Sequence, residues 1–99
     1  MSVVVTMRVP GDTTQFLQFV GDNQDWMRQT SERAKSMGCL HHRFAVGEGF
    51  VMVIDEWESP EQFQQFFSDP DIGEIMQRSG AQGEPQISIA EAIATADQF

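Results

Sequence analysis

The sequence predicts an α+β protein of the ferredoxin-like type, with the element order βαββαβ. Three observations lead to this prediction. Short apolar runs have the β-branched content of strands, and two longer stretches have the periodicity of helices. A glycine-rich turn joins the two middle runs without an intervening helix. The length of 99 residues suits one domain, so we expect a single domain over residues 1–99, with a four-stranded antiparallel sheet that carries both helices on one face.

The first strand is expected over Val3–Val9, which is apolar almost throughout and stops at Pro10-Gly11. Successive side chains of a strand point to opposite faces. One face of this strand carries only apolar side chains: Val3, Val5, Met7 and Val9. We expect this face to pack against the helices.

One long helix is expected next, and it ends at Gly38, which supplies the usual C-terminal stop. It begins at Asp12, Thr13 or Thr14, each of which is a competent N-cap. Apolar residues recur at three- and four-residue steps along one face. Gly21 lies within this pattern and is less favourable than alanine by about 1 kcal/mol, so it weakens the helix locally.

Two strands follow, Cys39–Val46 and Phe50–Trp57, and they form a hairpin. The turn between them contains Gly47 and Gly49, and glycine adopts a positive φ at little cost. Loop length decides the strand register, and a shift of one residue moves every side chain to the other face. We prefer a two-residue loop over a three-residue loop.

The register decides the partners of an adjacent pair of histidines. With the two-residue loop Glu48-Gly49, His41 pairs with Glu56 and His42 pairs with Asp55. With the three-residue loop, these partners change faces. A strand histidine beside a carboxylate can transfer protons near neutral pH, so His41 and His42 are the candidate catalytic residues.

The second helix begins at Ser59, because Ser59-Pro60-Glu61-Gln62 is a capping box with proline at the first helical position. Pro70 interrupts the helix, and a short helix then runs to Gly80. The last strand is expected over Pro85–Ile93, and residues 94–99 are expected to form a frayed tail. Apolar residues mark the inner side of the two helical pieces: Phe63, Phe66, Phe67, Ile72, Ile75 and Met76.

The charge balance excludes several classes of partner. Acidic residues outnumber basic ones 15 to 6, which gives a formal net charge of -9. Such a chain is a poor ligand for the phosphates of nucleic acid and for anionic membranes. No apolar run approaches the roughly 20 residues of a membrane span, and we expect no signal peptide, because no basic residues precede the short apolar run of the first strand. The single cysteine, Cys39, excludes an internal disulfide, and we expect a cytoplasmic protein.

Both faces of the first three strands carry apolar side chains, although the helices cover one face alone. An uncovered apolar face of that size exceeds what a monomer usually exposes. We therefore expect a homodimer that pairs sheet against sheet.

Residues 54–66, Ile54-Asp55-Glu56-Trp57-Glu58-Ser59-Pro60-Glu61-Gln62-Phe63-Gln64-Gln65-Phe66, resemble the strand-to-helix signature of the antibiotic-biosynthesis monooxygenase family. The resemblance implies a dimeric α+β barrel. Members of that family include cofactor-independent quinol oxygenases, haem-degrading oxygenases and proteins without known activity. The shared fold alone does not choose among these activities.

The resemblance also indicates which cofactors to expect. Haem-degrading members use an asparagine on the first strand, with a tryptophan and a histidine on the second helix. By register these places fall on Met7, Phe66 and Ile75, and none of the three matches. The quinol-oxidising members use tyrosines, and this sequence has none. We expect no cofactor.

A pocket between the sheet and the helices is the expected binding site for a small apolar or aromatic ligand. We expect six residues to line it: Met7, Trp57, Phe63, Phe66, Ile75 and Met76. The two histidines point to opposite faces and cannot hold one metal ion together. Cys39, His41 and Glu56 are the one set that could converge on a metal, and we expect no metal site.

Two functions fit these features. The first is a cofactor-independent monooxygenase-like activity on a small aromatic or polyphenolic compound, as the resemblance implies. The second is a non-catalytic dimer that binds a hydrophobic ligand or serves as a structural or stress-related module. A cavity that reaches one of the histidines favours the first, and a filled core favours the second.

Overall fold

The computed structural model describes residues 1–99 and contains four strands and four helices. The strands are β1 (Val3–Pro10), β2 (Cys39–Gly47), β3 (Phe50–Trp57) and β4 (Gln86–Glu91). They form one sheet in the order β2-β3-β1-β4, and all neighbours are antiparallel. This order confirms the predicted ferredoxin-like topology.

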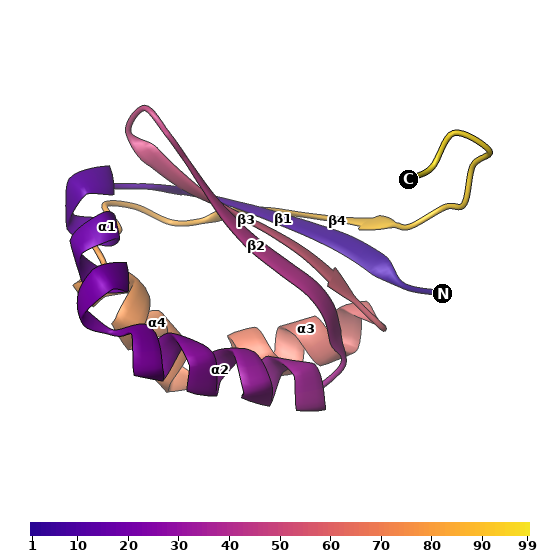
Figure 1. Ribbon diagram of the computed structural model, residues 1–99, viewed down its shortest axis with the longest axis horizontal. Helices are drawn as coiled ribbons and strands as arrows, with labels where there is room; N and C mark the ends of the chain where they lie inside the picture. The colour runs from indigo at the N-terminus through magenta and orange to yellow at the C-terminus, as the bar shows by residue number, and fades with distance from the viewer.

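The helices are α1 (Thr13–Asp22), α2 (Gln24–Ser36), α3 (Pro60–Phe67) and α4 (Pro70–Arg78). All four lie on the same side of the sheet, as predicted (Figure 1). The α1 helix stands at one end of the sheet and α2 runs beneath β2, whereas α3 and α4 lie behind α2 in this view. No helix combines the length and the apolar character that a membrane crossing requires.

The expectation of one long first helix is wrong, because the helix breaks at Asn23. The backbone of Asn23 leaves the helical region, with φ −130° and ψ 36°. Its side-chain amide donates to the carbonyl oxygen of Phe19 at 2.8 Å, which replaces a helical bond with a local one. The chain turns at this residue, so α1 and α2 run in different directions (Figure 1).

The second helical region has the predicted start and the predicted break. The hydroxyl of Ser59 accepts from the amide of Gln62 at 3.2 Å and donates to its side-chain oxygen at 2.7 Å. The chain leaves the helix after Phe67, and Asp69 caps α4 by accepting from the amide of Asp71 at 2.9 Å. The N-cap at Ser59 and the proline break are therefore confirmed, whereas the Gln62 side chain bonds the Ser59 hydroxyl instead of the Ser59 backbone amide that a full capping box uses.

The last strand is shorter than the predicted Pro85–Ile93. It ends at Glu91 because its partner strand β1 begins at Val3, the residue that pairs with Glu91. One further backbone bond joins Ala92 to Ser2 at 3.0 Å. Beyond it the chain leaves the sheet and ends far from the helices (Figure 1).

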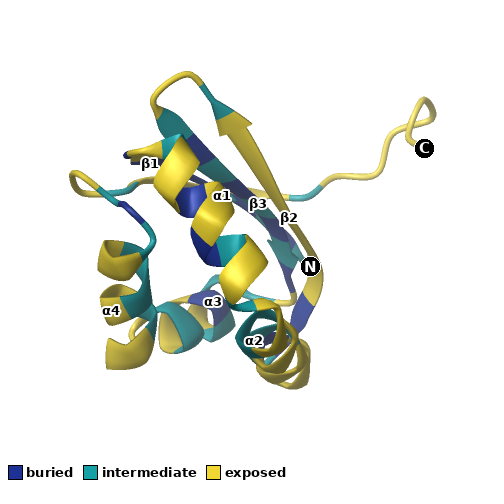
Figure 2. Cartoon of the chain, turned by 60° about the vertical axis from the view of Figure 1, so that its left-hand side comes forward, coloured by how far each residue is buried: buried dark blue, intermediate teal, exposed yellow.

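The core lies between the sheet and the helices, and it is small. Of the 99 residues, 16 are buried, and half of them lie on the helical side of β1 and β3 (Figure 2). They form two clusters, one around Val5 and Trp57 and the other around Met7 and Val53. The β2 strand is largely exposed even on its helical side.

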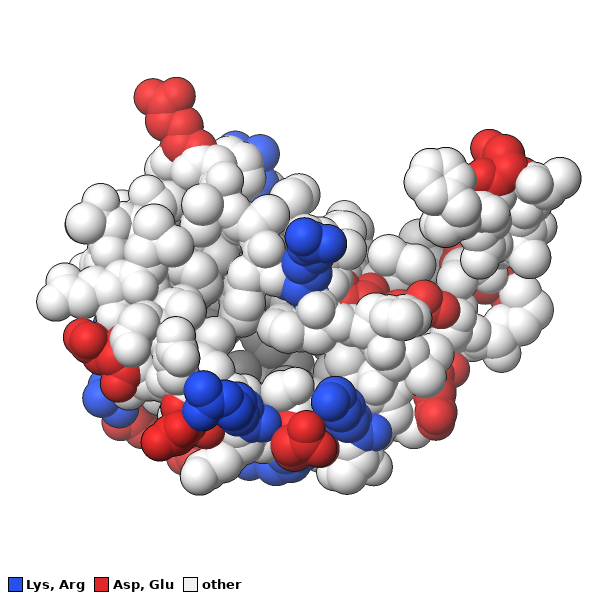
Figure 3. Space-filling view, in the orientation of Figure 1, with Lys and Arg blue, Asp and Glu red and all other residues white.

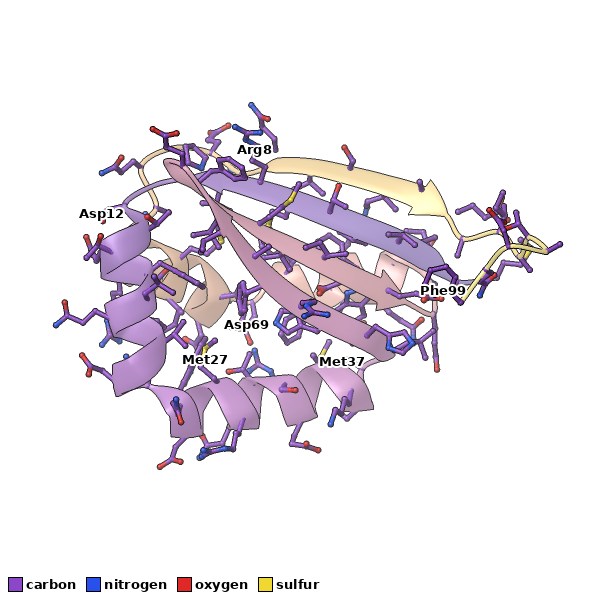
Figure 4. All side chains as sticks on the ribbon, turned by 45° about the horizontal axis from the view of Figure 1, so that its top comes forward. Arg8, Asp12, Met27, Met37, Asp69 and Phe99 are labelled. Atoms are coloured by element: carbon purple, nitrogen blue, oxygen red, sulfur yellow. The ribbon has the colours of Figure 1, made fainter.

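The other face of the sheet carries no helix (Figure 1). We call it the open face. Its central side chains are half-buried by their neighbours: Val4, Thr6, Met52 and Ile54. Arg8 belongs to this face and points away from the helices, with its guanidinium 3.8 Å from the centre of the Phe50 ring (Figure 4).

Candidate functional site

A large cavity lies between the helical face of the sheet and the helices. Its volume is about 790 Å³, and most of the residues that line it are apolar. Figure 3 shows the molecule hollowed between the sheet and α2, with Lys and Arg side chains beside the opening. Arg28 and Lys35 of α2 are among the lining residues. A cavity of this volume accommodates a ligand of several rings.

The cavity is bounded by the pocket residues that the sequence predicts. Each of the six lines it: Met7, Trp57, Phe63, Phe66, Ile75 and Met76. They come from β1, β3, α3 and α4, so strands and helices both contribute to the wall. Met27 adds to the wall from α2, on the side of that helix that faces the sheet (Figure 4). Ligand binding by these residues stays a prediction.

The hairpin has the two-residue loop, since Gly47 pairs directly with Phe50 and Gly49 has a φ of +80°. This register pairs His41 with Glu56 and His42 with Asp55. A bulge at Leu40 interrupts the ladder just before the histidines.

The two histidine side chains lie on opposite faces of the sheet. His42 lies on the helical face, with Asp55, and His41 lies on the open face, with Glu56. Both residues border the cavity, and the carbonyl oxygen of His41 accepts from the Cys39 thiol at 3.3 Å on that side. The imidazole that faces the cavity is therefore that of His42.

His42 and Asp55 form a hydrogen-bonded pair at the cavity wall. Their Nδ1 and Oδ1 atoms are 2.6 Å apart. Because a carboxylate oxygen accepts, we assign the proton to Nδ1, which leaves the lone pair of Nε2 free. The His42 side chain is 39% exposed, and its ring meets the ring of Phe44 edge-on at 4.7 Å. This arrangement is that of an oriented general base.

Asp55 is the one charged residue among those that are buried. Its second oxygen, Oδ2, accepts from the indole nitrogen of Trp57 at 3.1 Å. Both oxygens are thus hydrogen-bonded, which meets the main requirement for burying a carboxylate. No buried side-chain nitrogen or oxygen lacks a partner anywhere in the chain.

Cys39 is buried beside this network, and its thiol has a raised pKa. Burial, and then the negative charge of Asp55, raise the pKa of the Cys39 thiol to about 11, although the backbone bond to His41 opposes this shift. A thiol with so high a pKa holds almost no thiolate near neutral pH.

The candidate residues differ in what they offer a metal or a haem. No group of three or more His, Cys, Asp or Glu residues lies close enough together to hold a metal ion. Met7, Phe66 and Ile75, where the resemblance to haem-degrading oxygenases would place the haem-site residues, all line the cavity and carry neither an imidazole nor an amide. His42 is the one imidazole directed toward it.

Sequence reasoning did not single out Asp55 and Trp57 as parts of one network. A signal for Asp55 exists, because it occupies a buried register position of β3 between Val53 and Trp57. A charged residue in an otherwise apolar register is a candidate for function. The bond from the Trp57 indole has no sequence signal, since it depends on the orientation of the ring.

No family model matches the sequence, and no curated protein matches it. Solved structures do match, and antibiotic biosynthesis monooxygenases are among them. A dimeric ferredoxin-like protein from an uncultured marine organism has a TM-score of 0.68 and 10% identity, over 99% of this chain and 93% of that one.

Two oxygenases show the same similarity. A monooxygenase of Streptomyces coelicolor, solved with the ligand nanaomycin D, has a TM-score of 0.62 and 19% identity, over 98% of this chain and 93% of that one. A cofactor-independent oxygenase of Streptomyces nogalater has a TM-score of 0.64 and 14% identity, over 98% of each chain. At these identities the likeness concerns the fold alone. The chain therefore has the α+β ferredoxin-like fold that antibiotic biosynthesis monooxygenases also have.

Proposed function

We propose that the protein binds a small aromatic or polyphenolic compound in its cavity and promotes the oxidation of that compound by molecular oxygen without a cofactor. The observation that carries the proposal is the His42–Asp55 pair, which leaves an imidazole nitrogen without a protein partner at the wall of an apolar cavity. The likeness to oxygenases described above supports it, one of them named as cofactor-independent and another solved with a ligand.

His42 supplies the proton transfer that such a reaction requires. Its Nε2 takes the proton of a phenolic hydroxyl, and Asp55 stabilises the imidazolium that forms. The resulting phenolate is much richer in electrons than the phenol, so it reacts with oxygen directly. The apolar wall of the cavity keeps water away from the phenolate and from its oxygenated product.

The reaction balances without any other reactant. One oxygen atom of O₂ enters the ring as a carbonyl, and the other leaves as water. The two hydrogens of that water come from the hydroxyl and from the ring carbon that is oxidised, so a hydroxyaromatic becomes a quinone. All four electrons come from the substrate. The imidazolium of His42 returns its proton to the departing oxygen.

We also propose that the protein acts as a homodimer that buries the open face of the sheet. Support comes from the half-buried apolar side chains on this face, which no helix covers. The small number of buried residues supports it too, since a second copy would complete the burial of the sheet. One of the similar solved structures is described as dimeric.

Oxygen uptake tests the activity directly. A panel of hydroxyaromatics and quinols with one to three rings is mixed with the protein, and protein-dependent oxygen consumption and quinone formation are recorded. We expect turnover of at least one compound with two or three rings, and a loss of roughly 10²- to 10⁴-fold in His42→Gln. Uptake that is equal in His42→Gln and in the native protein would refute the role of His42.

His41→Gln is the matched control, because it removes the neighbouring imidazole from the opposite face of the same strand. We expect this variant to retain the native rate. Since His41 lies on the face proposed for dimer formation, sedimentation of both variants checks that neither change acts through the oligomeric state.

A ligand-binding protein without turnover is the second candidate function. The half-buried aromatic side chains of Phe66 and Phe67 in the cavity wall favour it, because such a surface binds planar ligands whether or not they react. Quenching of tryptophan fluorescence by a compound of the panel, with no oxygen consumption by any compound, would select this function.

A further inference from the structure

We propose that Trp57 is a positioning residue, which orients His42 by way of the Asp55 carboxylate. The inference rests on the proposed role of His42 as a base, and it goes beyond the expectation that Trp57 lines the pocket. Its evidence is geometric and comes from the hydrogen bonds and the packing of three residues.

The indole of Trp57 is a fixed donor. Its side chain is only 1% exposed. The ring of Phe63 meets it edge-on at 5.8 Å, and the ring of Phe66 lies against it at 5.4 Å. A ring that is packed in this way cannot turn its N–H toward another acceptor. The indole Nε1 therefore keeps Oδ2 of Asp55 as its acceptor, at 3.1 Å.

This donor determines which way the carboxyl group of Asp55 turns. With Oδ2 held by Trp57, the plane of the carboxylate is set and Oδ1 faces His42 at 2.6 Å. The acceptor at Oδ1 keeps the proton of the neutral imidazole on Nδ1. The lone pair of Nε2 is then free on a residue that lines the cavity, as the proposed reaction requires.

An amide in place of the carboxylate makes the role of Trp57 testable, because its two ends differ. In Asp55→Asn, the indole N–H selects the amide oxygen, so the amide NH₂ group faces His42. Nδ1 must then accept, and the ring proton moves to Nε2. The base is lost although its position is unchanged.

Removal of the indole N–H should reverse this effect. In the double variant Asp55→Asn with Trp57→Phe, no donor holds the amide oxygen, so the amide can turn and accept from Nδ1–H of His42. A residue that contributes packing alone would produce no such reversal. In Trp57→Phe by itself, the carboxylate loses one of its two restraints, and the Nδ1–H tautomer of His42 should lose population.

Nitrogen NMR of the imidazole side chains measures the tautomer directly in each variant. We expect Nδ1–H for His42 in the native protein, Nε2–H in Asp55→Asn, and a return toward Nδ1–H in the double variant. His41 serves as an internal reference in every spectrum. Trp26→Phe is the matched control, because Trp26 packs on Phe19 and has no bond to Asp55; it should leave the His42 signals unchanged.

Kinetics supply a second measure if a substrate is found. Trp57→Phe should lower kcat by about 10- to 100-fold and leave KM nearly unchanged, as expected for a residue that orients a catalytic group without touching the substrate. A rise in KM at constant kcat would instead assign Trp57 to ligand binding and overturn the inference.

The outcomes separate this inference from the proposed function. If His42 has the same tautomer in Asp55→Asn and in the double variant, the inference is overturned, even if oxidation occurs. If the His42 tautomer returns toward Nδ1–H in the double variant but no compound is oxidised, the proposed activity is refuted and the positioning role of Trp57 stands. If Trp57→Phe does not fold, the native indole resonance decides: it should move when His42 is titrated, and that of Trp26 should not. A Trp57 resonance that stays still would count against the inference.

Discussion

Asp55 occupies a strand position whose register neighbours are apolar. Val51, Val53 and Trp57 are buried on the same side of β3, and the hydrophobic pattern gives no reason for a carboxylate among them. A buried carboxylate is unfavourable unless it is hydrogen-bonded. Asp55 has a donor on each oxygen, and one of these donors is the imidazole that faces the cavity. Its place is explained by the orientation of His42 and not by packing.

Cys39 gives a prediction for alkaline solution. Its pKa in the folded chain is raised from 9.0 to about 11, chiefly by burial. Below pH 9 the thiol is protonated in the folded and in the unfolded chain, so this contribution to stability is complete. As the pH rises from about 9 to 11, the unfolded chain releases the proton and the folded chain keeps it, so the free energy of unfolding falls. Urea denaturation across this window measures the decline.

Few other side chains of this protein titrate in the same alkaline pH window. The chain has no tyrosine, and Lys35 is its one lysine, exposed on α2. Cys39→Ala removes the titrating thiol, so this variant should show a smaller decline over the same pH window. Equal slopes in the variant and the native protein would show that Cys39 is not the source.

At the scale of elements, the chain contains two helix breaks of different origin. The break before Pro70 is visible in the sequence, because proline cannot continue a helix. The break at Asn23 depends on a side-chain bond to the Phe19 carbonyl, and an asparagine makes this bond in some helices and not in others. The periodic apolar pattern continues through Asn23, so the sequence predicts one helix where there are two.

In the sheet and in the site, features with a local cause in the sequence were predictable, and features that depend on distant residues were not. The hairpin register follows from the glycine at position 49, and with it the pairing of His42 with Asp55. The end of β4 depends on where β1 begins, more than 80 positions earlier in the sequence. The cavity is lined by residues of both α1 and α2, so its shape depends on the helix break at Asn23. Neither property has a local sequence signal.

The N-cap of α3 gives the second prediction. Ser59→Ala removes the acceptor for the amide of Gln62 and should lower the free energy of unfolding by about 0.5–2 kcal/mol. Denaturant titration should show a lower midpoint with an unchanged slope. Ser36→Ala is the control, since Ser36 is exposed in the last turn of α2 and caps no amide; its effect should stay within about 0.5 kcal/mol. Equal midpoints for Ser59→Ala and the native protein would contradict the prediction.

At the scale of the whole molecule, the two faces of the sheet have different tasks. The helical face encloses the cavity and holds the His42–Asp55 pair. The open face carries side chains that are only half-buried, among them Met52 and Ile54. In the proposed dimer, residues of one β-strand serve the proposed site on one side and the proposed contact surface on the other. For this reason the chemistry and the oligomeric state can be changed separately.

The third prediction uses this separation. Sedimentation at micromolar concentration should show a species of twice the chain mass of 11.2 kDa. Ile54→Lys places a charge in the centre of the open face and should convert the protein to monomers. Leu17→Lys, which alters an exposed apolar residue of α1, should leave the dimer intact. A native protein that sediments only at 11.2 kDa would refute the dimer.

The last prediction is that the protein does not degrade haem, although its cavity is apolar and contains an imidazole. Haem degradation needs an iron ligand and a donor that steers the oxygen bound to iron. Met7 and Ile75 line the cavity where the resemblance to haem-degrading oxygenases would place the donor and the iron ligand, and neither side chain can serve. Only His42 faces the cavity, from the sheet, with Asp55 on its Nδ1. Haemin should therefore bind weakly and survive a reductant in air. A sharp Soret band at one haem per chain that decays with release of iron would overturn this prediction, and its loss in His42→Ala would identify His42 as the ligand.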